Sequence, residues 1–186
     1  MLPGAAGPGE RRSPRVGAGM RGAPLEVRFW ALVDKDGPGG CWLWTGSILD
    51  TGYGQISVGP RGSARRWLAH RLSWELVNGP IPAGMKIDHR CHVPQCVNPA
   101  PEHLRLATTK QNAENRIGPQ KGNRSGYRGV CWNRGRGAWE AACQHNGRKV
   151  FGGYFADIEE AAKAAAELRR GLFTHSDMDR SAERVA

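Results

Sequence analysis

The sequence lacks any long apolar run. No segment reaches the roughly 18 consecutive apolar residues that a membrane-spanning helix requires. The first 20 residues are rich in Gly, Pro and Ala and contain no apolar stretch of the kind found in a secretory signal. We therefore expect a protein that neither crosses a membrane nor is secreted, and that acts in the cytoplasm.

Acidic residues are scarce. The chain has 17 Asp and Glu against 27 Lys and Arg, a net charge of +10. Seven of the basic residues and one acid fall in residues 118–155, whereas residues 156–186 are net acidic. A concentrated positive field favours a polyanionic partner, although plain solubility would also account for the charge.

The chain is also modest in apolar residues, at 39% of 186, and it has 26 Gly and 12 Pro. These values suit two small units with many turns better than one large core. We predict a disordered basic arm at residues 1–24, a first folded unit at 25–117 and a linker at 118–125. A second unit would follow at 126–175, and a C-terminal tail at 176–186.

Local patterns predict the elements of the first unit. Residues 41–58 resemble a β-hairpin around a Gly-rich turn, and the apolar spacing of residues 66–78 predicts a helix that Gly79 ends. Residues 85–89 and 105–107 read as short strands. Residues 108–116 read as a helix, with Thr108 and Gln111 at the spacing of a capping box.

The second unit has stronger signals. Residues 127–133, 138–145 and 149–155 predict three strands, the last two joined by an Asn-Gly turn. Residues 157–171 predict a helix with Asp157 as its cap, a stripe of small residues on one face and Gly171 as its stop. The fold class is therefore α+β, and this unit is a small three-stranded antiparallel sheet packed on one helix.

Five cysteines, an odd number without a secretion signal, favour metal binding over disulfides. Cys91, Cys96 and His103 lie close in sequence, and Cys41 is the remaining cysteine of the first unit. Together they would form a tetrahedral zinc site that stabilises a unit with a modest core. His92 is a rival ligand, and two free structural cysteines are the alternative.

Asp88 and His89 are not needed for that zinc site. A histidine at a strand end beside a carboxylate suits a general base near an oxygen-ligated cation. Asp88 and an amide oxygen such as that of Asn112 would hold magnesium and leave positions for water and a phosphodiester. The alternative is a structural Asp-His pair.

The order CWLW…GYG…AHRLSWELVNGPIPAGMKIDHRCHVPQCVNP…HL…N, over about residues 41–116, resembles the HNH endonucleases of phages and mobile elements. It is also similar to the His-Cys box homing endonucleases, which share a ββα-metal (His-Me finger) site. The resemblance implies His89 as general base and Asp88 with Asn112 as ligands of magnesium or another divalent cation. It implies a structural zinc on Cys41, Cys91, Cys96 and His103.

Three further positions bear on this resemblance. The family pattern NPxHL is here NPAPEHL, two residues longer, and the insertion before His103 could displace that ligand. Asn98 is expected to fix the loop backbone, or to be an ordinary turn residue. Arg71 could contact a phosphate, although a structural role is favoured.

The pattern YRGV…W…WEAA…GRKVFGGYF…EEAAKAAAEL resembles the plant-type Apetala/ethylene-response-factor DNA-binding domain. The resemblance implies a sheet that docks on double-stranded DNA. Arg128 matches its reading face by order, and Trp132 would stack on sugar or base edges. Phosphate contacts are expected from Arg134, Arg136, Arg148 and Lys149. The family's target sequence does not transfer, because Cys131, Asn133, Ala142 and Gln144 replace its charged readers.

These observations predict a metal-dependent DNA endonuclease of a bacterial or phage-infected cell, targeted by its C-terminal unit. One site per chain would nick one strand, so a double-strand break would need a homodimer on DNA or two events. The alternative is a non-catalytic DNA-binding or regulatory protein with a degenerate HNH fold and structural zinc. A zinc protein that binds RNA is a third reading.

Overall fold

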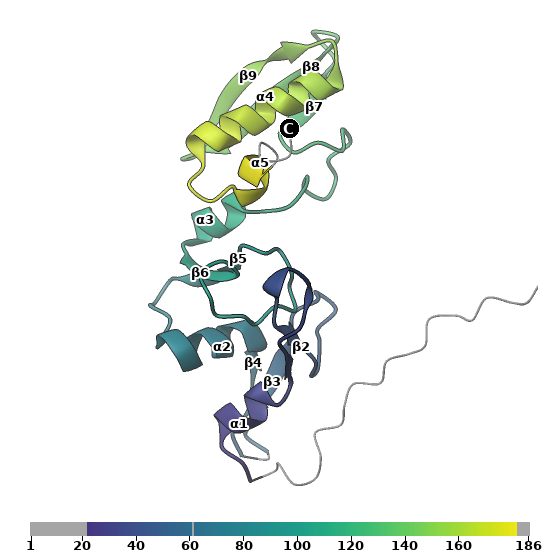
Figure 1. Ribbon diagram of the computed structural model, residues 1–186. Helices are drawn as coiled ribbons and strands as arrows, with labels where there is room; N and C mark the ends of the chain where they lie inside the picture. Colours follow the sequence, from purple (N-terminus) through teal and green to yellow (C-terminus); the bar gives the residue numbers. More distant parts are fainter. Residues whose placement is uncertain (1–21, 61, 182–186) are drawn as a thin grey trace, which may run out of the picture. The chain divides into compact units, whose positions relative to one another are not determined.

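The computed structural model describes residues 22–60 and 62–181 (Figure 1). The chain divides into two compact units: one runs to Ile81 and includes Val93–Arg105, and the other comprises Pro82–His92 and the chain from Leu106 onward. All but the last three residues of the predicted basic arm lie outside the described part. No helix among the described residues is long and apolar enough to cross a membrane.

The described residues of the first unit form two small antiparallel sheets and two α-helices. After helix α1 (Leu25–Trp30), strand β1 (Val33–Asp34) pairs with β2 (Leu43–Trp44), with a short 3-10 helix η2 (Pro38–Gly40) between them. Strand β3 (Gln55–Val58) pairs with β4 (Arg65–Leu68), and helix α2 (Ala69–Asn78) follows directly.

The predicted hairpin over residues 41–58 is wrong, because its two arms pair with other strands. Around β2, the Trp44 N–H donates to the carbonyl of Gln95 (3.0 Å) and the Val97 N–H donates to the carbonyl of Trp42 (2.8 Å). With β1 on its other side, β2 has no free edge for β3. Only a tight turn, bridged at Ile48 and Gly54, remains of the hairpin.

The helix predicted at residues 66–78 begins later than expected, at Ala69. Residues Arg65–Leu68 belong to β4, so ladder hydrogen bonds to β3 override the helical spacing there. The helix ends as predicted at Gly79, whose φ of 84° is a conformation that glycine adopts readily.

The core of this unit is built on aromatic rings. Phe29 stacks on Trp44 with ring centroids 5.0 Å apart. The buried cluster is completed by Ile56, Ala69, Leu72 and Val97. Helix α1, which local signals did not predict, presents Phe29 to this core.

Strand β5 (Lys86–His89) of the second unit pairs with β6 (Leu104–Ala107), which enters that unit at Leu106. Helix α3 (Thr109–Glu114) follows and packs on β5. The strands were predicted at these places. The capping box of Thr108 and Gln111 is also confirmed, with both reciprocal hydrogen bonds present.

The rest of this unit is the predicted sheet and helix. Strands β7 (Val130–Asn133), β8 (Ala138–His145) and β9 (Arg148–Phe155) form an antiparallel sheet in that order, and helix α4 (Ile158–Leu172) lies along one face (Figure 1). Ala161 and Ala165 on the predicted small-residue stripe are fully buried against it.

Three details of this region differ from expectation. Gly171 does not stop α4, which continues to Leu172 and is capped by Phe173. A further short helix, α5 (Asp177–Ser181), forms where a tail was predicted. The segment expected as a linker is bonded to the start of β7, since Asn123 donates to the carbonyls of Tyr127 (3.1 Å) and Val130 (3.3 Å). The mixed α and β architecture with small antiparallel sheets is as predicted.

Candidate active site and metal cluster

Asp88 and His89 form the end of β5, and both side chains are buried, at 5% and 8% exposure. Helix α3 packs against this strand. Burying a carboxylate is costly unless hydrogen bonds compensate it. The group that does so was not among the predicted residues.

That group is Asn115, at the C-terminal cap of α3. Its amide nitrogen donates to both carboxylate oxygens of Asp88 (3.1 and 2.9 Å) and to the backbone carbonyl of His89 (3.1 Å). The predicted cation ligand Asn112 lies three residues earlier, on the same face of the helix. The Asn-x-x-Asn spacing was therefore the signal in the sequence that could have identified Asn115.

The four predicted zinc ligands lie together. One ligand atom from each of Cys41, Cys91, Cys96 and His103 falls within 4.8 Å of all the others. The His103 Nδ1 atom lies 3.6 Å from the sulfur of Cys41 and 3.7 Å from that of Cys96. Tetrahedral zinc, with bonds of about 2.3 Å to sulfur and about 2.0 Å to nitrogen, separates such atoms by about 3.5 Å. The cluster fits a zinc ion.

The longer NPAPEHL loop does not displace His103. Asn98 donates to the carbonyl of Gly40 (2.8 Å) and accepts from the N–H of Ala100 (3.1 Å), which fixes the loop backbone. The His103 N–H then donates to the carbonyl of Ala100 (2.9 Å). The rival ligand His92 is not part of the four-residue cluster.

Comparison with known proteins bears on this geometry. Residues 68–114 match the HNH endonuclease family. The matched HNH segment contains α2, β5, β6 and α3, and with them Asp88, His89 and Asn112.

The chain is also similar to phage proteins. It is 40% identical over 80 residues to Protein 3.8 of Escherichia phage T7, covering 43% of this chain and 64% of that protein. It is 35% identical over 77 residues to Protein 7.7 of the same phage, and 33% identical over 89 residues to Protein 2.8. These matches cover 41% and 48% of this chain, but only 55% and 57% of those relatives. No solved structure matches.

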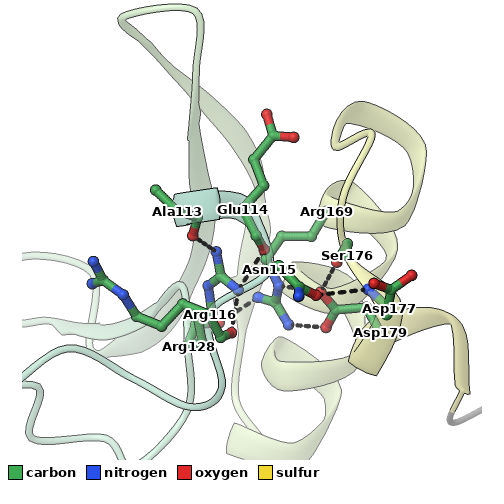
Figure 2. Close-up of polar contacts among 9 residues, drawn as sticks. All are labelled: Ala113, Glu114, Asn115, Arg116, Arg128, Arg169, Ser176, Asp177 and Asp179. Atoms are coloured by element: carbon green, nitrogen blue, oxygen red, sulfur yellow. Dashed lines mark hydrogen bonds and ion pairs between the residues drawn. The ribbon is translucent and has the colours of Figure 1, made fainter. Parts of the chain in front are cut away.

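The chain around the C-terminal end of the HNH segment is bonded to Arg128, which lies just before strand β7 (Figure 2). Arg128 donates to the backbone carbonyls of Ala113 (3.2 Å), Glu114 (3.1 Å) and Arg116 (2.7 Å). The carbonyls of Ala113 and Glu114 belong to the last turn of helix α3, which leaves them without helical partners. The guanidinium also lies over the ring of Phe173, 5.5 Å from its centroid.

Two carboxylates near this junction are stabilised in their charged form. Burial alone would raise the pKa of Glu114, but hydrogen bonds from Lys110 and Thr174 outweigh it and the pKa lies below its ordinary value. Burial likewise opposes ionisation of Asp179, whereas hydrogen bonds from Arg169 and Ser176 lower its pKa. Both groups are held as anions.

The other predicted DNA contacts lie on β7–β9 and their turns. Trp132 is 48% exposed, with its ring edge-on to Trp139. The Arg136 guanidinium lies 5.2 Å from the ring centroid of Tyr154, and Lys149 forms an ion pair with Glu140. Arg134 follows β7 and Arg148 begins β9. Arg71 is half-buried on α2.

Proposed function

We propose that this protein is a metal-dependent DNA endonuclease that hydrolyses phosphodiester bonds, with His89 as its general base. The observation that supports this most is the match of residues 68–114 to the HNH endonuclease family around a buried Asp-His pair at a strand end. A purely structural pair would not account for both the match and the adjoining helix with two amides on one face.

The roles of the residues follow from their chemistry. His89 as a neutral imidazole accepts a proton from the attacking water near pH 7. Asp88 and Asn112 offer hard oxygen atoms, the ligands that magnesium prefers. When bound, the divalent cation neutralises the phosphate and stabilises the departing 3′ oxygen.

The zinc cluster has a structural role in this proposal. Four protein ligands from the η2–β2 turn and the 91–103 loop leave no open coordination position, which is typical of structural rather than catalytic zinc. The ion would fix the loop that separates β5 from β6.

The sheet β7–β9 is proposed as the DNA-binding module. The net charge of residues 118–155, the exposure of Trp132 and the aromatic pair Phe151 and Tyr154, 53% and 42% exposed, support it. Arg134, Arg136, Arg148 and Lys149 would contact phosphates. Arg128 would have to release three carbonyls to reach DNA, so we assign it to bonding the sheet to α3.

A plasmid assay tests this function. Zinc-loaded protein with magnesium should convert supercoiled plasmid to nicked circles. The nick should have a 5′-phosphate and a 3′-hydroxyl, which DNA ligase can reseal. Omission of magnesium should stop the reaction. Protein that shifts DNA in a gel without nicking it would instead support the non-catalytic DNA-binding reading.

A further inference from the structure

We propose that Asn115 is a positioning residue for the cation ligand Asp88, and that the segment after α4 holds Asn115 in place. The inference rests on the proposed function, because it assigns Asp88 to the divalent cation. It adds a residue outside the matched HNH segment, which ends at residue 114.

The hydrogen bonds of Asn115 define one orientation of its amide. The backbone carbonyl of His89 can only accept, so the NH2 group of Asn115 must face it and the Asp88 oxygens beside it. The amide oxygen then points the other way, where the backbone N–H of Asp177 lies 3.4 Å from it. Each polar atom of the Asn115 side chain has a partner of the right kind, and the residue is 4% exposed.

This arrangement restricts the Asp88 carboxylate. The two hydrogens of the Asn115 NH2 group are shared among three acceptors, and its contacts to both Asp88 oxygens restrict rotation of the carboxylate while each oxygen keeps a lone pair for a metal ion. The third bond holds the main chain of His89, so the same amide sets the base and the cation ligand relative to each other. Residues that hydrogen-bond to metal ligands orient those ligands and thereby raise the affinity of the site for its metal ion.

Asn115 is in turn held from the C-terminal side of the chain. Thr174 donates through its N–H and its hydroxyl to the carboxylate of Glu114, both at 3.1 Å. Arg169 binds Asp179 through two nitrogens, at 2.9 and 2.6 Å, which fixes α5 against α4 (Figure 2). Asp177, at the start of α5, thereby reaches Asn115.

An ion pair between Arg90 and Asp177 also connects the end of β5 with the start of α5. The Arg90 side chain, directly after His89, lies 3.8 Å from the carboxylate of Asp177. Because both groups are partly exposed, this pair contributes little by itself. Together with the Asn115 contact it places the start of α5 at the end of β5, so Thr174, Asp177 and Asp179 belong to the scaffold of the active site.

Cation affinity of the full-length protein tests the inference without DNA. Titration of zinc-loaded protein with Mn²⁺ in a calorimeter should give a dissociation constant roughly 10–100-fold higher for Asn115→Ala than for the unmodified protein. The same variant should need correspondingly more Mg²⁺ for half-maximal nicking. Unchanged Mn²⁺ affinity in folded, zinc-containing Asn115→Ala protein would overturn the proposal, as would the absence of Mn²⁺ binding in the unmodified protein.

A second pair of variants covers the case in which Asn115→Ala does not fold. Asp177 is the first residue of α5, a position where proline is tolerated. Asp177→Pro removes both its N–H and its carboxylate, whereas Asp177→Ala removes the carboxylate alone. We expect weaker Mn²⁺ binding for the proline variant than for the alanine variant. Met178→Ala, at a 49% exposed neighbour, should match the unmodified protein. Equal affinities for all three would overturn the role of the C-terminal segment.

The two proposals can fail separately. A protein that binds Mn²⁺ in an Asn115-dependent way but never nicks plasmid would keep the positioning role and reject the endonuclease. A protein that nicks plasmid with Mn²⁺ affinity independent of Asn115 would keep the endonuclease and reject the positioning role.

Discussion

At the scale of single residues, the two candidate sites differ in how they keep buried polar groups satisfied. Asp88 depends on hydrogen bonds from Asn115, whereas the four Cys and His ligands gather around a space that suits zinc. Cysteines bind zinc as thiolates, and the free energy of zinc binding contributes to folding, so the second arrangement should depend on metal.

Removing one zinc ligand should therefore release the metal. Cys96 is fully buried in the cluster, and Cys96→Ser replaces a thiolate with a poor zinc ligand. We expect the zinc content, measured by plasma emission spectrometry, to fall well below one per chain, with a lower melting temperature. Cys131→Ser, at an exposed cysteine outside the cluster, is the control and should keep its zinc. Full zinc content in Cys96→Ser would refute the assignment.

A second prediction concerns the close approach of glycine to Trp44. A Cβ at Gly54 would lie 2.4 Å from the Trp44 ring, which is buried in the core of the first unit. Gly54→Ala should lower the free energy of unfolding by about 1–3 kcal/mol, the usual cost of an overpacked core. Gly171→Ala, where a Cβ meets nothing within 4 Å, is the control. Chemical denaturation measures the free energy of unfolding of both variants. Equal stabilities would contradict the close contact of Gly54 with the Trp44 ring.

At the scale of elements, the basic sheet β7–β9 should contact phosphates. Arg148→Ala should weaken binding of duplex DNA and reduce the slope of log K against log salt by about 1. Lys163→Ala removes the same charge from an exposed position on α4 and should leave the slope unchanged. Fluorescence anisotropy without added divalent cation gives the slope for each variant. Identical slopes for Arg148→Ala and Lys163→Ala would argue against phosphate contacts by Arg148.

Elements with complete local signals could be predicted from the sequence. The capping box of Thr108, the Asp157 cap and strand β8 all occur where local spacing put them. The two-residue strands β1 and β2 could not be predicted, since their hydrogen bonds come from distant segments such as residues 95–97. Helix α1 is likewise determined by the packing of Phe29 on Trp44, which no local pattern encodes.

In the candidate site, too, the residues with local sequence signals could be predicted and those that depend on tertiary packing could not. The zinc ligands and the Asp88–His89 pair could be predicted because their residue types and spacing are unusual. For Asn115 the sequence offers only its Asn-x-x-Asn spacing from Asn112, because its role depends on where α3 lies against β5. The bonds from Arg128 to the end of α3 also depend on tertiary packing. The sequence does not reveal them, and the order of residues alone therefore led to the prediction that Arg128 contacts DNA.

At the scale of the whole molecule, the network around α3 and α5 makes stability depend on pH. The pKa values of Glu114 and Asp179 lie below their ordinary values in the folded state. The unfolded chain therefore takes up protons at higher pH than the folded chain. This contribution is complete above the ordinary carboxylate range, about pH 4–4.5, and is lost as the pH falls through the lowered values.

Melting temperatures measured between about pH 7 and pH 3 test this dependence. Compared with the unmodified protein, Asp179→Asn should melt lower at pH 7, and the difference should shrink as the solution is acidified. Glu167→Gln, at an exposed carboxylate of α4, is the control. A difference that stays constant with pH would contradict the coupling of Asp179 to Arg169 and Ser176.

The central claim is that His89 is the general base of an endonuclease. The most direct measurement is the rate of plasmid nicking by His89→Ala at saturating magnesium, beside the unmodified protein and His175→Ala, a histidine outside the HNH segment. Loss of a general base should slow nicking by roughly 10²–10⁴-fold, with zinc content unchanged. His175→Ala should nick at the unmodified rate. Undiminished nicking by His89→Ala would contradict the account.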